Sequence, residues 1–276
     1  MTKRAFLLLL PFLFACASTN TPPLTRTDTT ATAAPSDRLE NTPRHDEWVR
    51  IDRGGRTLHA YVSYPQSSAK APAVLLIHEN RGLTDWVRTV ADRLSENGYL
   101  VIAPDMLSGM APGGGRTSDF PTQDAAREAI SKLEMPNVLA DLNATADYVL
   151  ALPAANGRLS VAGFCWGGSR AWQFANARPG LTAAYVFYGT GPSEPAGVAN
   201  IQSPVYGFYG GADARVNETI PRSRELMQAR GVTFDPVIYE GAGHAFMRLG
   251  EEAGASDANR RAHDEAWVRW LGLLRR

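Results

Sequence analysis

Cysteine is scarce in this sequence. Only Cys16 and Cys165 occur among 276 residues, so neither a disulfide framework nor a cysteine-rich zinc site can be built. An excess of either charge is also lacking: 28 Lys and Arg balance 28 Asp and Glu, which argues against the positive field that a nucleic-acid binder needs. Hydrophobic residues make up 44% of the chain, which excludes wholesale disorder. The composition is that of a globular protein with a substantial core.

A short hydrophobic run follows the N-terminus. Two basic residues precede Ala5 to Ala15, as in a secretory signal peptide, and the run is too short to span a bilayer. Its end, Leu-Phe-Ala-Cys16, resembles the lipobox of bacterial lipoprotein precursors, which implies lipid on that cysteine. We therefore expect a protein anchored on the periplasmic side of a bacterial membrane, with the outer membrane as the expected site. A plain signal peptide with an incidental Cys16, giving a soluble secreted or periplasmic protein, is the alternative.

The stretch after Cys16 lacks both hydrophobic periodicity and aromatic residues. Residues 17–44 are dominated by Ser, Thr, Pro, Asn and Asp, which is typical of a flexible tether. Folding signals start near Trp48, and no comparable break follows them. We expect a signal peptide over residues 1–15, a lipidated cysteine and tether over residues 16–45, and a single domain over residues 46–276.

The domain alternates strand-like and helical patterns. Uninterrupted apolar runs such as residues 73–77 are typical of strands buried on both faces of a parallel sheet. Strands are expected at residues 49–52, 58–63, 73–77, 99–103, 158–162, 183–187, 204–209 and 237–240. Helices are expected near residues 87–94, 138–149, 168–177, 219–230 and 257–273. This alternation predicts a doubly wound α/β sheet, in which ligands bind at the carboxyl ends of the strands.

A glycine-rich turn stands between one expected strand and the next helix. It reads Gly163-Phe-Cys165-Trp-Gly-Gly168, and such a turn needs glycine because side chains beside the nucleophile would collide with neighbouring backbone. Cysteine occupies the nucleophile position, where the positive end of the helix dipole favours a thiolate. On the turn alone, the alternative is a buried Cys165 that packs as a small hydrophobic residue.

Two further residues stand where the partners of such a nucleophile are expected. Asp213 follows the strand over residues 204–209, and His244 follows the strand that ends near Glu240. The chain order of nucleophile, acid and histidine is that of a catalytic triad on this kind of sheet. Taken alone, Asp213 could cap a turn and His244 could have no role. Together with Cys165 at the same sheet edge, they predict a Cys-His-Asp triad.

These motifs together resemble the dienelactone hydrolase family of α/β-hydrolases. The matching segments are Ile77-His-Glu-Asn-Arg-Gly82, Ala103-Pro-Asp105, Gly163-Phe-Cys-Trp-Gly-Gly168, Gly210-Gly-Ala-Asp213 and Gly243-His-Ala-Phe246. The resemblance extends over residues 47–274. It implies an α/β-hydrolase fold, that is, a doubly wound and mostly parallel sheet with helices on both faces, and a Cys-Asp-His triad that works without a cofactor.

Each candidate residue can be given an expected role. Cys165 attacks an ester or lactone carbonyl, while His244 serves as base and then as acid. Asp213 orients the imidazole and stabilises its charged form. The backbone N–H of Trp166 stabilises the oxyanion, and the family implies a second donor at the N–H of Asn80.

The family also implies roles for two charged residues. Glu79 matches an acid that contacts the resting thiol and takes part in its activation, a solvated loop acid or a salt bridge being the alternative. Arg248 matches one of two arginines that hold the substrate carboxylate, a surface arginine being the alternative. The second arginine belongs in the loop after Asp105, where this sequence has none, and Arg116 lies further along at a position that does not match. Half of that anion site is missing.

The expected function is hydrolysis of a small ester or lactone through a thioester, as by a dienelactone hydrolase (carboxymethylenebutenolidase). The alternatives are a general carboxylesterase or thioesterase, a non-catalytic binding lipoprotein that retains the fold, and a thiol redox sensor. No metal is indicated, because Gly82 takes the place of the second histidine in the pattern H-E-x-x-H begun by His78. We expect a monomer that contacts the membrane through its lipid anchor and has no nucleic-acid partner.

Overall fold

The structure is a computed structural model that describes residues 1–2 and 35–276. Internal contacts divide the chain into residues 1–31 and 32–276, and all the elements below belong to the second unit. Apart from residues 1–2, the expected signal peptide, the lipidated Cys16 and the tether up to residue 34 lie outside the described residues. Within the described residues, no helix has the length and apolar character needed to cross a membrane.

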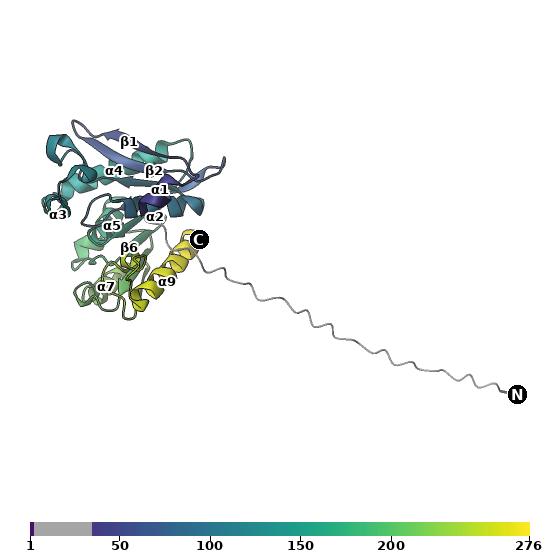
Figure 1. Cartoon of the computed structure of the whole chain (residues 1–276). Helices are drawn as coiled ribbons and strands as arrows, with labels where there is room; N and C mark the ends of the chain where they lie inside the picture. Colours follow the sequence, from purple (N-terminus) through teal and green to yellow (C-terminus); the bar gives the residue numbers. More distant parts are fainter. Residues whose placement is uncertain (3–34) are drawn as a thin grey trace. The chain divides into compact units, whose positions relative to one another are not determined.

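Eight strands form one sheet within residues 46–239 (Figure 1). They are β1 (Asp46–Asp52), β2 (Thr57–Ser63), β3 (Ala71–Ile77), β4 (Leu100–Pro104), β5 (Ala155–Phe164), β6 (Ala184–Phe187), β7 (Val205–Gly210) and β8 (Phe234–Tyr239). Their order across the sheet is β1-β2-β4-β3-β5-β6-β7-β8. β2 runs antiparallel to β1 and β4, and every other neighbouring pair is parallel. The doubly wound, mostly parallel sheet expected for an α/β-hydrolase is therefore confirmed.

Helices cover both faces of this sheet (Figure 1). One face carries α4 (Met135–Ala151), α5 (Trp166–Ala177) and α7 (Ile220–Ala229), and the other carries α2 (Asp85–Glu96) and α9 (Asp257–Leu274). The shorter helices are α1 (Pro35–Glu40), α3 (Gln123–Ser131), α6 (Ala214–Asn217) and α8 (Phe246–Leu249), with 3₁₀ turns at Pro112–Gly114, Thr117–Asp119 and Pro195–Val198.

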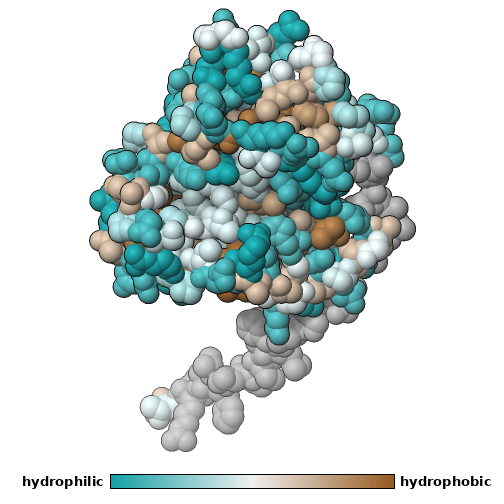
Figure 2. Space-filling view, turned by 90° about the vertical axis from the view of Figure 1, so that its left-hand side faces the viewer, coloured by the Kyte–Doolittle hydropathy of each residue, from teal (hydrophilic) through white to brown (hydrophobic). Residues whose placement is uncertain are grey.

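Alternation along the central strand β3 explains the two layers of helices. Leu75 and Ile77 belong to the core under α4 and α5, whereas Val74 and Leu76 belong to the core under α2 and α9. All four are buried, so both faces of the sheet must be covered. On the outer face seen in Figure 2, hydrophilic residues cover most of the surface and hydrophobic ones reach it in small separate patches.

Within the described residues, the segment before β1 is attached to the rest of the domain. Residues 35–45, assigned to the tether from the sequence, include helix α1, which packs against α2. Arg38 and Arg44 form ion pairs with the buried Asp92 of α2, and Thr42 donates a hydrogen bond to the same carboxylate. Leu39 also packs against the core under α2 and α9, but a single apolar residue among polar contacts leaves no hydrophobic periodicity in the sequence.

The glycine-rich loop after β4 is fixed at its base by Asp105. The buried carboxylate of Asp105 accepts hydrogen bonds from the N–H of Thr117 at 2.8 Å and from its hydroxyl at 2.7 Å. Thr117 Oγ1 in turn accepts a hydrogen bond from the N–H of Leu83 at 3.0 Å. The loop after β3, which contains Glu79 and Asn80, is thereby tied to the loop after β4.

Candidate active site

Cys165 occupies a strained turn between β5 and α5. Its backbone has φ 55° and ψ −114°, a conformation that residues with side chains rarely adopt. A Cβ on Gly163 would lie 2.0 Å from the carbonyl oxygen of Gly167, and one on Gly167 would lie 2.3 Å from that of Ile77. The two glycines are therefore required for the turn to pack against β3 and the start of α5.

The structure brings His244 and Asp213 to this thiol from two later loops. His244 Nε2 lies 3.0 Å from Cys165 Sγ, and His244 Nδ1 lies 2.5 Å from Asp213 Oδ2. Asp213 follows β7 and His244 follows β8, and both strands run parallel to β5, so their carboxyl ends meet at one sheet edge. The three predicted residues thus form a continuous hydrogen-bonded row.

This row favours a charged imidazole. Burial opposes a charge on His244, but its hydrogen bonds with Cys165 and Asp213 outweigh that effect and raise the pKa of His244 to about 9. Near neutral pH the imidazole is then largely protonated, which is the form that pairs with a thiolate. The geometry suits proton exchange between the histidine and the thiol.

A cavity of about 270 Å³ opens beside the thiol. Cys165, Trp166 and Asn80 all line it. Trp166 is the first residue of α5, where a backbone N–H has no partner within the helix. The two residues expected to supply backbone N–H groups to the oxyanion, Trp166 and Asn80, therefore line the same cavity as the Cys165 sulfur.

Glu79, the acid expected near the thiol, forms a buried ion pair. Its Oε2 accepts a hydrogen bond from Arg248 Nε at 3.0 Å, and its Oε1 accepts one from the hydroxyl of Tyr188 at 3.3 Å. Within the described residues, Cys165 Sγ is hydrogen-bonded to His244 and not to Glu79. Burial, with the Glu79 charge adding to it, raises the pKa of Tyr188 well above its ordinary value, so its hydroxyl remains a donor.

Arg248 is not among the residues that line the cavity at Cys165 in the described chain. Besides Glu79, which its Nε binds, its Nη1 binds Glu252 at 2.9 Å. The cations that do line this cavity are Arg127 of α3 and Arg215 of α6. Arg116 lies elsewhere, with its guanidinium carbon 3.7 Å from the centre of the Trp48 ring.

Sequence reasoning missed both of these cavity arginines. Arg127 belongs to helix α3, which the sequence patterns did not predict. Thr122 caps this helix by accepting a hydrogen bond from the N–H of Ala125. Its buried residues, Ala126 and Ile130, lie four residues apart. Arg215 stands two residues after Asp213, so its position beside the acid was a usable signal.

His78 is a buried, neutral residue that supports the site. Its Nδ1 donates to the carbonyl of Glu79 at 2.7 Å, and its Nε2 accepts from the N–H of Met106 at 3.2 Å. Burial lowers the pKa of His78. Its ring stacks on that of Trp166, with centres 5.6 Å apart. Among the described residues, no cluster of three or more His, Cys, Asp or Glu side chains could hold a metal ion.

Comparison with known proteins gives consistent matches over the folded domain. The model of the dienelactone hydrolase family matches residues 58–276. A Salmonella typhimurium protein provisionally named carboxymethylenebutenolidase is 34% identical over 227 residues, which cover 75% of this chain and 81% of that protein. A Methylorubrum extorquens protein with the same provisional name is 32% identical over 213 residues, covering 72% and 71%.

Solved structures extend the match to the fold. The crystal structure of a provisionally identified dienelactone hydrolase from Klebsiella pneumoniae matches with a TM-score of 0.72 and 27% sequence identity. The match covers 83% of this chain and 98% of that one.

Proposed function

Since the chain belongs to the dienelactone hydrolase family, we propose that it hydrolyses a small ester or lactone through a thioester on Cys165 and uses no cofactor. The observation that carries this proposal is the row of hydrogen bonds from Cys165 through His244 to Asp213. A strained turn that exposes a thiol to both a histidine and a cavity serves no purpose in a module that only binds.

Acylation begins when the Cys165 sulfur attacks the carbonyl carbon. A carbon–sulfur bond forms, and the carbonyl electron pair moves onto oxygen, where the N–H groups of Trp166 and Asn80 stabilise it. The tetrahedral intermediate then expels the ester oxygen, which takes the proton from His244 Nε2. In a lactone this step opens the ring and leaves a hydroxyl on the acyl group. Asp213 holds His244 in the orientation that both steps need.

Deacylation reverses the roles of the same groups. Water attacks the thioester carbonyl while His244 takes up one of its protons. The carbon–sulfur bond breaks, the acid leaves, and the thiolate of Cys165 is restored beside a charged imidazole. The raised pKa of His244, about 9, supports this end state because it stabilises the pair at neutral pH.

The substrate that this cavity favours is small and negatively charged. A volume of about 270 Å³ fits a compact acyl group, and the exposed Arg127 and Arg215 supply positive charge along its wall. Arg127 already pairs with the exposed Asp124, whereas Arg215 forms no ion pair among the described residues. We propose that Arg215 takes the part that the family gives to an arginine after Asp105.

Hydrolysis assays test the function. Wild type is assayed on p-nitrophenyl acetate, a small lactone and dienelactone, beside Cys165→Ala, His244→Ala and the surface control Arg224→Gln. We expect both triad variants to lose at least about 10³-fold in kcat/KM and the control to match wild type. Wild-type turnover that persists in Cys165→Ala would refute the thioester mechanism.

The N-terminal part of the proposal is a lipid anchor at Cys16 on the periplasmic side of a bacterial membrane. Its support is the sequence of residues 1–16 alone. Cells fed a radiolabelled fatty acid should label wild type and Cys165→Ala to the same extent. Equal labelling of Cys16→Ala would show that the lipid is elsewhere or absent from this residue.

A further inference from the structure

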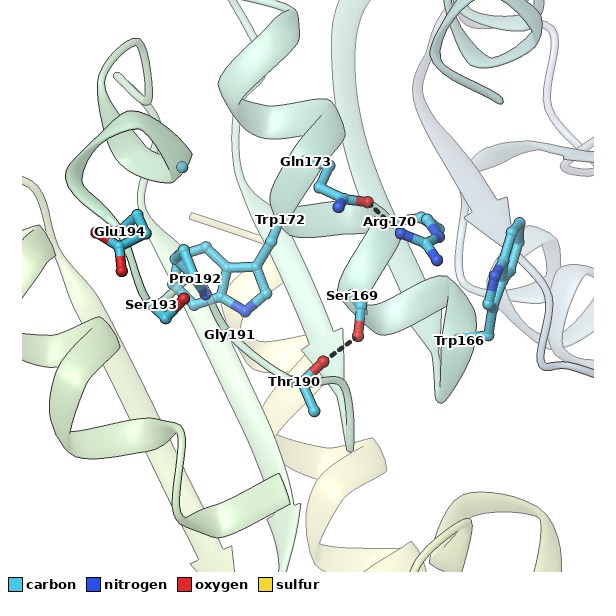
Figure 3. A pocket seen from close by; sticks show the side chains of 11 residues that line it. Trp166, Ser169, Arg170, Trp172, Gln173, Thr190, Gly191, Pro192, Ser193 and Glu194 are labelled. Carbon is cyan, nitrogen blue, oxygen red and sulfur yellow. Dashed lines mark hydrogen bonds between the residues drawn. The ribbon is translucent and has the colours of Figure 1, made fainter. Parts of the chain in front are cut away.

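A second cavity lies beside the one that contains Cys165. Its volume is about 390 Å³, and Trp166, Ser169 and Thr190 line both cavities. The hydroxyls of Ser169 and Thr190 are hydrogen-bonded at 2.8 Å and form part of the shared wall (Figure 3). A substrate bound at the thiol therefore has a neighbouring space into which it can extend.

The position of His244 relative to the two cavities indicates which part of a substrate they would hold. His244 must face the leaving oxygen, because it gives that oxygen a proton. In the described chain, Cys165 and Asn80 line the first cavity, whereas His244 lines neither. The part of the substrate that stays on sulfur is therefore the part that faces these cavities.

Arg170 brings a positive charge without an acidic partner to the second cavity. Figure 3 shows its guanidinium between Gln173 and Trp166. Nη1 donates to Gln173 Oε1 at 2.6 Å, and the guanidinium carbon is 4.9 Å from the centre of the Trp166 ring. Within residues 35–276, no carboxylate lies within 4.0 Å of Arg170, and its buried Nε has no hydrogen-bond partner. The positive charge of this guanidinium therefore has no acidic neighbour to neutralise it in the described chain.

The remaining walls suit a hydrocarbon chain that ends in an anion. Trp172 and Pro192 provide apolar surface. The acid of this cavity, Glu194, lies at the opposite end from Arg170 in Figure 3, so it leaves the positive end unneutralised. Arg170 lines the second cavity but not the one at Cys165, so the wall of Ser169 and Thr190 lies between its guanidinium and the thiol. A carboxylate near Arg170 must then stand several carbons from the scissile carbonyl.

We propose, on the basis of the function proposed above, that the second cavity binds the distal end of the acyl group and that Arg170 selects acyl groups ending in a carboxylate. The preferred substrates are then monoesters of medium-length dicarboxylic acids. The Nη groups of Arg170 donate to the distal carboxylate, and the methylene chain passes Ser169 and Thr190 toward the thiol.

Matched ester pairs test the selectivity. The mono-p-nitrophenyl esters of succinate, adipate and suberate are compared with p-nitrophenyl butyrate, hexanoate and octanoate, so that each pair shares leaving group and chain length. For wild type we expect the anionic-to-neutral ratio of kcat/KM to be highest for adipate or suberate. Arg170→Gln should lower that ratio at least about tenfold, as expected for a lost charge-assisted hydrogen bond, and should lower the succinate ratio far less.

Two further variants separate this role from a structural one. Arg170→Lys keeps the charge and should retain most of the selectivity, and the exposed Arg224→Gln should behave as wild type. Because Arg170 also stacks on Trp166, a merely structural role would lower the anionic and neutral rates together and leave their ratio unchanged. An unchanged ratio in Arg170→Gln, with hydrolysis still dependent on Cys165, refutes the subsite and leaves the proposed function intact.

A binding measurement tests the same site without turnover. Adipate and hexanoate are titrated into wild type and Arg170→Gln by calorimetry. We expect adipate to bind wild type at least about tenfold more tightly than it binds the variant, with little difference for hexanoate. This result in a protein that cleaves no ester would support the subsite and refute the proposed function. Equal adipate binding to both proteins refutes the subsite.

Discussion

Backbone strain in this molecule is concentrated around the triad. In the described part of the chain, the non-glycine residues with positive φ are Cys165, Tyr188 and Ala245. Ala245 follows His244, and the ring of Tyr188 lies 5.1 Å from that of His244. Such conformations cost on the order of 1–3 kcal/mol each and persist only where surrounding packing imposes them. The buried core around the site therefore holds the triad in place.

The charge on His244 should depend on the thiol. Replacing Cys165 with Ala removes one of the two hydrogen bonds that raise the pKa of His244 to about 9, and burial then opposes the charge more effectively. We expect the pKa of His244 to fall in Cys165→Ala, measured by NMR titration of the imidazole. His263 of α9, which donates to the carbonyl of Met247, serves as the internal control. An unchanged His244 titration would contradict the coupling.

The same shift makes folding stability depend on pH. Because folding raises the pKa of His244, its charged form stabilises the folded state fully below the ordinary histidine pKa of about 6.5. That contribution disappears as the pH rises through about 9. The Tm difference between wild type and Cys165→Ala should accordingly shrink between about pH 6.5 and pH 9. Calorimetry below and above this interval measures the change.

The triad could be predicted from the sequence because each member stands in a glycine-bearing loop after a strand. Arg127 could not be found that way, since only the folded chain shows that it borders the cavity, whereas Arg215 stands two residues after Asp213 in the sequence. For Arg248, the motif gave the position but not the ion pairs with Glu79 and Glu252 that occupy its guanidinium.

At the scale of elements, the turn from β5 into α5 should tolerate no side chain at Gly163. Gly163→Ala would place Cβ 2.0 Å from the Gly167 carbonyl oxygen, so the start of α5 must move. We expect a loss of about 1–3 kcal/mol in the free energy of unfolding, measured by urea denaturation. Gly272→Ala in α9 meets nothing within 4 Å and should instead stabilise by about 0.5–1 kcal/mol. Equal effects of the two substitutions would contradict the argument.

The elements that the sequence predicted are those with a continuous hydrophobic signal. All eight strands and helices α2, α4, α5, α7 and α9 occur where patterns of buried residues place them. Helices α1 and α3 lack such patterns, because ion pairs with Asp92 hold the segment of α1 and only Ala126 and Ile130 are buried in α3. Short helices held by polar contacts are not visible to periodicity.

At the scale of the whole domain, Asp92 joins the segment before β1 to the second layer of helices. Arg44 holds this fully buried carboxylate with two hydrogen bonds, of 2.7 and 2.8 Å, and Arg38 adds a third at 2.7 Å. Burial alone would raise the pKa of Asp92, but these bonds and that of Thr42 hold it below its ordinary value. One acid thus holds residues 38–44 against α2.

Removing the main partner of this acid should destabilise the domain. Arg44→Met keeps much of the side-chain volume but leaves the Asp92 charge with fewer partners, so we expect a loss of about 3 kcal/mol in the free energy of unfolding. Because folding lowers this pKa, the loss should be full above the ordinary aspartate pKa of about 4 and should shrink as the pH falls further. The exposed ion pair of Arg222 with Glu225 is the control. Arg222→Met should change the free energy of unfolding by less than about 1 kcal/mol.

The contacts around Asp92 also determine how the domain responds to mechanical load. Tension applied to the chain before residue 35 reaches the ion pairs of Arg38 and Arg44 before it reaches β1, an edge strand that pairs only with β2 in the described sheet. Those ion pairs link the segment to α2, so the pull is shared with a helix packed against the core instead of peeling β1 from the sheet one hydrogen bond at a time. In a pulling experiment, Arg44→Met should therefore unfold at a lower force than wild type.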